Sequence, residues 1–515
     1  MNTILLQTLA APDINLSVFL PEMIVAVFGI IVMLYDCFAP RQRHVTGALS
    51  LVGLAASAAA LFWLWQAGAG IPTSAFNGMI VTDGLRLSFT LVFLIVTALT
   101  ILVSTVWVER ESVPVGEYHA MLMFATFGMM LMASGNDLVI LFLGLETLSI
   151  ATYVMAGLRR TDLRSNESAM KYFILGSFAS AFLLYGMALI YGATGSTNVA
   201  EIAARIADPN FPALLLVGGA MLMVGFGFKI ASVPFHVWTP DVYEGAPTPI
   251  TAFMAAGPKA AAFASFVRVF VLGFPLVTGV QAASFLHESW ITALSIMAIL
   301  TMTVGNIAAI EQNNVKRMLA YSSIAHAGYA LVGFIGAGMA ATAEKRDEAV
   351  LAVAFYMLTY AVTNLGAFAV VTLLAQKNDR RTQFEDYNGI GFRSPVLAFT
   401  LSLFMLSLFG LPLTAGFMGK ILVFRPAIEA GNTLLTVLVV IGVVNSAISA
   451  YYYLRLIVVM FFRERTTEWL APKIPAALAA VLVITVLGVL YLGIFSDSVL
   501  RLFKNTPVTA VKAER

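Results

Sequence analysis

Four ionisable residues lie inside long apolar runs, where a charged side chain costs several kcal/mol unless it is paired or hydrated. They are Glu146 in LFLGLETLSIATY, Lys229 at the end of its run, Lys259 in ITAFMAAGPKAAAFASF and Lys420 in SLFGLPLTAGFMGKILVF. Three lysines and one acid do not balance, so at least one lysine must be neutral or hydrated. An amine removed from water has a lowered pKa and can exchange protons near neutral pH. We therefore expect proton transfer at these four residues, the alternative being a static buried ion pair.

Two further polar residues in apolar runs are candidates for a proton relay, Lys171 and His326. Each has a structural alternative: Lys171 could be a helix-end lysine that reaches the membrane interface, and His326 could form a hydrogen bond between helices. Arg268 and Arg455, near the ends of apolar runs, are expected to anchor their helices. Helical spacing also puts Tyr153 on the same face as Glu146.

The stretch FKIASVPFHVWTPDVYEGAPTP (228–249) places helix breakers beside Lys229. Pro234 cannot donate to a helical hydrogen bond and disfavours helical geometry at the preceding residue. Backbone groups freed in a membrane need partners in protein or in a wet cavity. The same pattern recurs at Gly410 to Pro412, shortly before Lys420. Two interrupted helices, each with a lysine, are typical of transporters built from inverted repeats.

The composition indicates a membrane protein. Of 515 residues, 60% are hydrophobic and 11% are charged, against about 25% charged in soluble domains. The net charge of +2, with no basic stripe, gives no indication of nucleic-acid binding. The single Cys37 excludes a disulfide framework, a thiolate cluster and a CxxC redox pair. The N-terminal stretch lacks a basic region and a cleavage site, so we expect a retained lead into the first span and no signal peptide.

Apolar runs of about 20 residues, the length that crosses a bilayer, predict an all-α integral membrane protein with about fourteen transmembrane helices. We expect one membrane domain over 1–515, containing two inverted five-helix repeats at 119–272 and 289–460, each with a broken helix. Alternation with a period of two is absent, which argues against a β-barrel. The predicted spans lie near 18–36, 46–66, 85–108, 119–134, 137–158, 168–192, 213–231, 248–272, 289–310, 318–337, 350–375, 395–428, 433–460 and 474–496. The longest connections, around 193–212 and 376–394, are expected to carry surface helices.

Lysine and arginine are unevenly divided between alternate connections. One set holds fifteen, including Arg41, Arg465 and Lys473, whereas the other set and the C-terminal tail together hold eight. Cytoplasmic loops carry the excess of positive charge. The richer set is therefore predicted to be cytoplasmic, and both termini are predicted to lie on the opposite, periplasmic side.

Three tracts of the chain resemble a known family. VPFHVWTPDVYEGAPTP (233–249), NNVKRMLAYSSIAHAGY (313–329) and GFMGK (416–420) are similar to tracts of the antiporter-like membrane subunits of respiratory complex I, the NADH-quinone oxidoreductase. The first tract looks like the signature of subunit N, since the M and L subunits do not usually read VYEGAP there. The resemblance covers essentially the whole chain.

The resemblance implies roles for individual residues. Glu146 corresponds to a glutamate on the fifth helix that pairs with a lysine on the broken seventh helix, here Lys229. Lys259 corresponds to the central lysine of the eighth helix and Lys420 to the terminal residue on the broken twelfth. Two secondary polar positions of the family fall at Lys171 and His326. Together these residues would form a hydrated axis in the membrane plane.

The resemblance also implies the surroundings of the chain. It predicts a multi-pass protein of a bacterial-type inner membrane, in contact with lipid and with the neighbouring K and M subunits. The substrate of the chain would be protons, with no nucleic acid bound. Flavin, iron–sulfur and nicotinamide centres would lie on other subunits, so no cofactor is expected on this chain.

The expected function is proton translocation driven by quinone reduction elsewhere in the complex. Two charges about 4 Å apart attract by roughly 4 kcal/mol at an effective dielectric of about 20, equivalent to about three pKa units. Opening or closing a Glu146–Lys229 pair could therefore switch the lysine between holding and donating its proton. The alternatives are a subunit of a multi-protein sodium/proton antiporter, which sodium-dependent flux would favour, and a passive membrane scaffold. For a scaffold, neutralising Glu146 or Lys420 would leave pumping intact.

Overall fold

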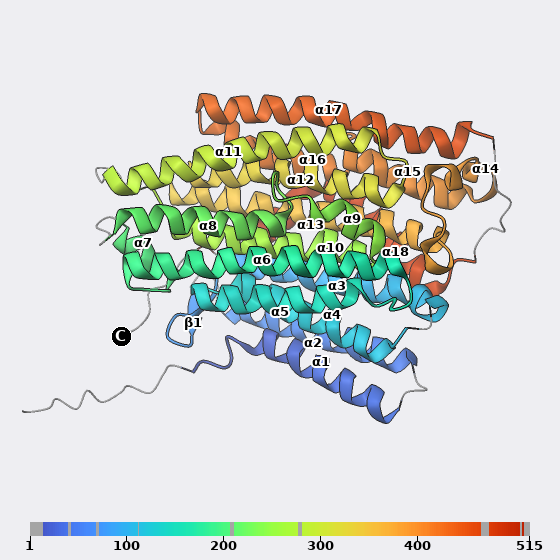
Figure 1. Ribbon diagram of the computed structural model, residues 1–515, viewed down its shortest axis with the longest axis horizontal. Helices are drawn as coiled ribbons and strands as arrows, with labels where there is room; N and C mark the ends of the chain where they lie inside the picture. The colour runs from blue at the N-terminus through green and yellow to red at the C-terminus, as the bar shows by residue number, and fades with distance from the viewer. Residues whose placement is uncertain are drawn as a thin grey trace, which may run out of the picture.

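The computed structural model describes residues 14–39, 43–67, 72–111, 113–206, 211–276, 281–464, 473–504 and 507–508, and these are almost entirely helical (Figure 1). The predicted all-α class is confirmed. The expectation of a retained N-terminal lead falls largely on residues 1–13, outside the described residues. Several of the counted charges, Arg41, Arg465, Lys512 and Arg515, also lie outside them.

Twelve of the described helices are long and apolar enough to cross a membrane. They are α1 (Leu20–Phe38), α2 (Arg43–Ala67), α3 (Gly84–Glu111), α5 (Leu138–Ala156), α6 (Leu163–Thr194), α8 (Pro212–Ile230), α10 (Thr248–Phe266, continued by the π-helical η1, Val267–Leu272), α11 (Gln281–Ile310), α12 (Val315–Gly338), α13 (Ala343–Leu374), α17 (Thr433–Phe462) and α18 (Ala476–Ile494). The two other predicted spans correspond to α4 (Val115–Ser134) and to the pair α15 (Pro395–Phe409) and α16 (Ala415–Glu429). Each predicted span thus coincides with a helix or an interrupted helix.

Both predicted helix breaks are confirmed. The first follows α8, where Ala231 takes a left-handed conformation with φ 60°, and the chain resumes as the short helix α9 (Trp238–Gly245). The second follows α15, where Gly410 has φ 101°. Glycine populates this region readily because it has no Cβ atom.

The connections contain short elements. The surface helices predicted around 193–212 and 376–394 are present as α7 (Val199–Arg205), the 3₁₀ turns η2 (Lys377–Asp379) and η3 (Phe384–Tyr387), and α14 (Ile390–Arg393). Outside those regions lie α19 (Ser496–Lys504) and a two-stranded antiparallel hairpin, β1 (Thr73–Ala75) and β2 (Ile80–Thr82), with Thr73 opposite Thr82.

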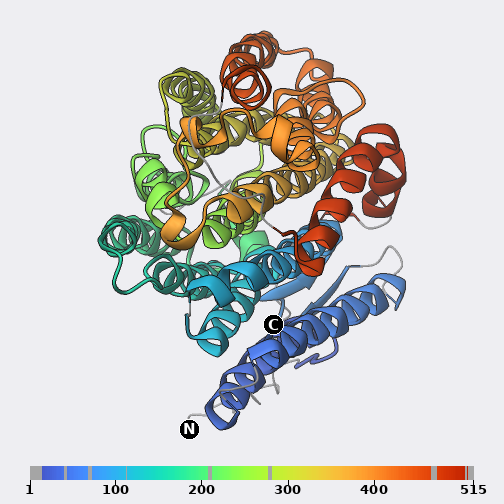
Figure 2. The same ribbon diagram turned by 90° about the vertical axis from the view of Figure 1, so that its right-hand side faces the viewer.

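The helices surround a core of α10, α12 and α13. The apolar windows of α10 and α13 are wholly buried and that of α12 is nearly so, whereas α1 with α2 and α17 lie at opposite edges of the bundle (Figures 1 and 2). Helix α10 is rich in alanine and glycine, and small residues let helices approach closely in membranes. A side chain at Gly257 would meet Met129 Sδ at 2.8 Å.

The order of the helices follows the predicted repeats. In the series α4, α5, α6, α8/α9, α10 and in the series α11, α12, α13, α15/α16, α17, the fourth member is the broken one. This order is compatible with repeats at 119–272 and 289–460. The inverted relation between them stays a prediction.

Arg268 is a correction to the sequence analysis. It does not anchor its helix at the interface, because it is completely buried and its two terminal nitrogens each lie 2.7 Å from Asp83 at the start of α3. A second buried ion pair joins Arg86 and Glu22 at 2.6 Å. These pairs fix α1, α3 and the π-helical end of α10 to each other, since breaking a buried pair exposes an uncompensated charge to the protein interior.

The connections rich in lysine and arginine meet at one end of the bundle. Asp379, completely enclosed there, lies 3.3 Å from both Arg159 and Lys316 and 3.7 Å from Arg110. Burial raises the pKa of this carboxyl, but the three cations outweigh that effect and hold it below its usual value. Pro507 accepts a hydrogen bond from the backbone N–H of Gly84 at the opposite end, where α3 begins.

Candidate proton-transfer site

Lys229 lies in the last turn of α8, directly before the first break. The side chain is 5% exposed, and its Nζ has no hydrogen-bond partner among the described residues. The ammonium lies over three aromatic rings, 5.2 Å from the centroid of Tyr153, 5.3 Å from Tyr172 and 5.7 Å from Phe228. Ring faces attract a cation without accepting its protons in strong hydrogen bonds. The amine is thus held in place but not bonded.

Glu146 lies half-buried on α5 and accepts a hydrogen bond of 2.5 Å from Ser180 Oγ on α6. The expected direct pair with Lys229 is not formed, because that amine has no hydrogen-bond partner and no ion pair among the residues that the structure describes. Tyr153, two turns further along the predicted face of α5, takes the place beside the amine. Seven residues of helix span about 10 Å, which explains the separation.

Lys259 lies in the middle of α10 at 2% exposure. Its Nζ donates to the carbonyl oxygen and to Oγ of Ser323 on α12, both at 2.6 Å. The central lysine is therefore tied to α12 through neutral oxygens and forms no ion pair among the described residues.

Lys420 points from α16 into the second break. Its Nζ donates to the carbonyls of Leu408 at 3.1 Å and Phe409 at 2.7 Å, which end α15, and to Ser446 Oγ at 2.6 Å. A cation at a helix C-terminus is stabilised by the helix dipole, by about 0.3–1 kcal/mol. A groove of about 580 Å³ between α16 and α17 reaches this lysine from the side of the bundle.

His326 lies on α12 between the central and terminal lysines. Its Nδ1 is 2.7 Å from the hydroxyl of Tyr356, and its Nε2 is 3.3 Å from that of Tyr453. The ring also packs edge-on against Tyr329, over which the Lys420 ammonium lies at 5.0 Å. Ser323, His326 and Tyr329 are three residues apart, so one face of α12 connects the two lysines.

Aromatic side chains fill the space between Lys229 and Lys259. Tyr172 stacks on Trp238 with ring centroids 4.5 Å apart, and the ring of Trp238 lies 6.1 Å from that of Tyr243. The buried row therefore runs from Glu146 through Lys229, Lys259 and His326 to Lys420. Of the tyrosines in this row, the sequence analysis predicted only Tyr153, although a hydroxyl inside an apolar span is a signal that could have identified the others.

Lys171 is placed apart from this row. It is 41% exposed and forms ion pairs of 2.7 Å with both Glu167 and Asp241. Asp241 is shared with Arg317, which also pairs with Glu244 at 3.1 Å. These charges line a pocket of about 210 Å³ at the lysine- and arginine-rich end. Lys171 is held in a half-exposed ion cluster. This position resembles the structural alternative given above, a helix-end lysine that reaches the membrane interface, more than a place in a buried relay.

The arrangement suits the movement of protons more than covalent chemistry. Three enclosed amines, an imidazole and several hydroxyls can bind and release protons, and the described residues include no group of His, Cys, Asp and Glu arranged to hold a metal ion. Water could occupy the breaks, because free backbone groups make them polar. The row could therefore carry protons in the membrane plane.

Comparisons with known proteins identify the family. Residues 135–449 match the family model described as NADH:quinone oxidoreductase/Mrp antiporter, TM. A chain of respiratory complex I from Thermus thermophilus is 36% identical, covers 94% of this chain and 100% of its own, and superposes with a TM-score of 0.77. A chain of the Mrp complex from Dietzia sp. has a TM-score of 0.81 over 96% of this chain and 97% of its own, but at 20% identity this shows the fold alone.

Curated relatives give the subfamily. NADH-quinone oxidoreductase subunit N of Trichlorobacter lovleyi is 45% identical over 95% of this chain and 96% of the relative. Subunit N 1 of Solibacter usitatus is 43% identical over 94% and 95%. With this identity over nearly the whole of both chains, the chain belongs to the family of NADH-quinone oxidoreductase subunit N proteins.

Proposed function

We propose that this chain translocates protons in the membrane arm of a NADH-quinone oxidoreductase, with Glu146, Lys229, Lys259 and Lys420 carrying the transfer. The observation that carries the proposal is the enclosed Lys259 amine, which is bonded to Ser323 and lies at the centre of the row. A buried amine without a carboxylate partner costs free energy that a passive scaffold does not need to spend. Quinone reduction on other subunits would supply the energy, and no flavin, iron–sulfur or nicotinamide group would bind here.

The first step of the proposed transfer involves Glu146 and Lys229. Within the described part of the chain the Lys229 ammonium has no hydrogen-bond acceptor to leave, so a change in the charge or position of Glu146 would alter the free energy of its protonated form directly. The released proton would move toward Lys259, carried by water past the stacked Tyr172 and Trp238. His326 and the neighbouring hydroxyls would then pass it toward Lys420. Because these groups interact, their apparent pKa values would belong to the row as a whole.

The proposed surroundings follow from the family and from the charge distribution. We expect the chain in a bacterial inner membrane, with the end that carries Arg159 and Lys316 facing the cytoplasm and both termini in the periplasm. The neighbours would be the K subunit on one side and the M subunit on the other. The terminal lysine, Lys420, would then lie near the boundary with one of these neighbours.

The test is substitution of Lys259 by methionine in the assembled complex, reconstituted in proteoliposomes. Methionine keeps the length and apolar stem of the side chain but cannot bind a proton. We expect the number of protons pumped per NADH oxidised to fall strongly, whereas the matched Lys171→Met variant should retain most pumping because Lys171 lies outside the row. Normal pumping by Lys259→Met, with normal assembly, would overturn the proposal.

A further inference from the structure

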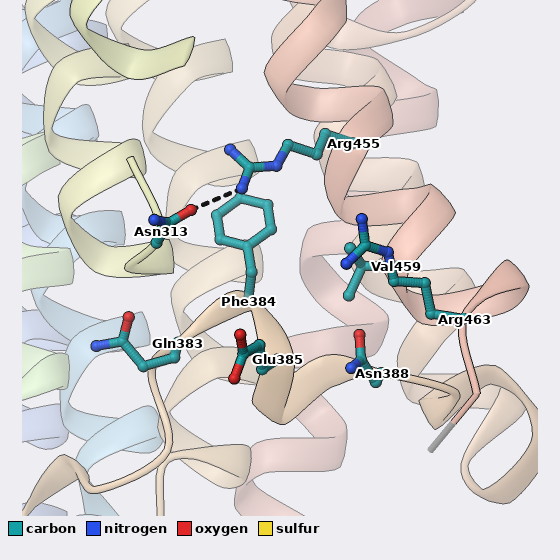
Figure 3. Close-up of a pocket in the computed structure, with 8 residues that line it drawn as sticks. All are labelled: Asn313, Gln383, Phe384, Glu385, Asn388, Arg455, Val459 and Arg463. Carbon is teal, nitrogen blue, oxygen red and sulfur yellow. Dashed lines mark hydrogen bonds between the residues drawn. The ribbon is translucent and has the colours of Figure 1, made fainter. Parts of the chain in front are cut away.

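A polar pocket of about 220 Å³ opens at the lysine- and arginine-rich end, between α17, η3 and the residues that precede α12 (Figure 3). Its polar lining consists of two arginines, three amides and one carboxylate. These residues are Asn313, Gln383, Glu385, Asn388, Arg455 and Arg463. The pocket is separate from the buried row of lysines.

Arg455 is fixed in place within this pocket. Its guanidinium lies 4.6 Å from the ring centroid of Phe384, and its Nη2 donates to Asn313 Oδ1 at 2.7 Å. Nη1 donates to the backbone carbonyls of Ile310 and Gln312, both at 3.1 Å. These bonds use three of the five N–H groups of a guanidinium, which leaves two for a ligand. The position of the charge is therefore set before any ligand binds.

Arg463 adds a second charge to the pocket. It directly follows Phe462, the last residue of α17. Figure 3 shows its side chain extending back along α17 toward the pocket. Neither guanidinium forms an ion pair within the part of the chain that the structure describes, whereas Arg425 and Arg346 elsewhere are paired with acids. With Glu385 as the one carboxylate of the lining, two cations face one anion.

An apolar surface borders the pocket. The C-terminal part of α17 exposes Tyr451, Leu454, Val458 and Phe462, of which Phe462 is 80% exposed. At 100° per residue, Val458 and Phe462 lie within about 60° of Arg455 around the helix. Phe399 of α15, 67% exposed, packs against Phe461 at 5.3 Å and extends this surface. A polar pocket beside an apolar surface matches an amphipathic ligand.

We propose that this pocket binds the phosphate group of an anionic membrane lipid, whose acyl chains lie along α17 and α15. Arginine offers paired N–H groups that match the oxygens of a phosphate, and the amides of Asn313 and Gln383 supply further donors. The excess of one positive charge favours a lipid with net negative charge over a zwitterionic one. The adjoining apolar surface favours a lipid over a free phosphate ion.

Native mass spectrometry of the delipidated full chain tests the proposal. Phosphatidylglycerol and phosphatidylcholine serve as the lipid probes and inorganic phosphate as a competitor. We expect phosphatidylglycerol to bind more tightly than phosphatidylcholine, and Arg463→Gln to weaken it about tenfold, the effect of losing one hydrogen bond to a charged group. Arg463 makes no hydrogen bond within the described part of the fold, so this variant should fold normally.

Two controls make the result decisive. Arg160→Gln removes the same charge from a 77% exposed position in the other half of the chain, and it should leave binding unchanged. Arg455→Gln, which also removes the bonds to α11, should weaken binding at least as much as Arg463→Gln. Equal affinity for the two lipids, no effect of Arg463→Gln, an equal loss in Arg160→Gln, or displacement of the lipid by inorganic phosphate would each overturn the proposal.

Discussion

The two broken helices differ in how they hold their lysines. At the first break the Lys229 amine makes no hydrogen bond to any described residue and lies over the faces of Tyr153, Tyr172 and Phe228. At the second break the Lys420 amine donates to three oxygens, two of them backbone carbonyls of α15. Similar sequence features, a lysine beside a break, have produced one amine without bonds and one fully bonded amine.

The cause is the way each helix end satisfies its last carbonyls. At the end of α8, Ser232 donates from its backbone N–H and its Oγ to Gly227, and Trp238 Nε1 donates to Phe228 at 3.0 Å. At the end of α15, the N–H groups of Gly410 and Leu411 both donate to Leu406. The carbonyls of Leu408 and Phe409 therefore remain for Lys420. Where other groups cap the end of the helix, the lysine amine is not needed as a cap and stays available for proton transfer.

Lys420 thus has a structural role at its helix end, whereas Lys229 has none. An amine that caps a helix contributes to the stability of the fold, and its removal leaves buried carbonyls unsatisfied. An enclosed amine with no hydrogen bond contributes nothing that an apolar side chain could not replace. We infer that Lys229 is the mobile donor of the row and that Lys420 is its fixed terminal.

The greatest difference is expected in the free energy of unfolding when each of the two lysines is replaced by methionine. Lys420→Met should lower the free energy of unfolding by about 3 kcal/mol, because the carbonyls of Leu408 and Phe409 both lose a charged donor and Phe409 keeps another donor, Ser446 Oγ. Lys229→Met should leave it unchanged or raise it, since a buried charge is replaced by an apolar group of similar size. Thermal unfolding of the purified chain measures both. Equal destabilisation by the two variants would show that the breaks do not differ in this way.

A smaller effect on stability is expected from a variant that makes the first break resemble the second. Trp238→Phe removes the indole N–H from the Phe228 carbonyl, which then keeps only the backbone N–H of Ala231 as donor. The variant should cost about 1 kcal/mol and should let this carbonyl accept from the adjacent Lys229 side chain. Pumping should slow because the amine gains a hydrogen bond. Trp290→Phe is the matched control, because its indole donates to the backbone carbonyl of Phe274 at 3.3 Å, away from both breaks. If both variants affect pumping alike, the cap at the first break has no special role.

The smallest effect concerns the backbone of the second break. Gly410→Ala should cost roughly 1–2 kcal/mol because its φ of 101° is unfavourable for alanine. The new Cβ would also lie 3.4 Å from Lys420 Nζ. Gly431→Ala, at φ 64° with open space around the Cβ, provides the same kind of backbone strain without that contact. If Gly410→Ala reduces pumping and Gly431→Ala does not, the backbone geometry of the second break affects proton transfer through Lys420. If the two variants pump equally, the geometry of the break has no such effect.

Much of the fold could be predicted from the sequence because its signals are local. Apolar runs of membrane length gave the spans, and the prolines and glycines gave both breaks. Helix α9 was not predicted within the first break, where Pro240 lies in its first turn, a position that tolerates proline. The β1–β2 hairpin was also missed, since each strand has only three residues.

The candidate site was less predictable because its contacts depend on how helices are rotated against each other. Spacing along α5 placed Tyr153 correctly on the face of Glu146, but it could not show that Tyr153, and not Glu146, would lie beside Lys229. Likewise, Lys171 and Lys229 are both lysines near helix ends, and the half-exposed position of Lys171 follows from its tertiary partners Glu167 and Asp241.

The most direct test of proton transfer through the row is the number of protons pumped per NADH by the assembled complex that carries Lys229→Met. Because this variant is expected to fold as well as the original chain, a loss of pumping cannot be attributed to unfolding. We expect a clear fall in the number of protons pumped per NADH at unchanged thermal stability. An unchanged ratio in a correctly assembled complex would contradict proton transfer through the row.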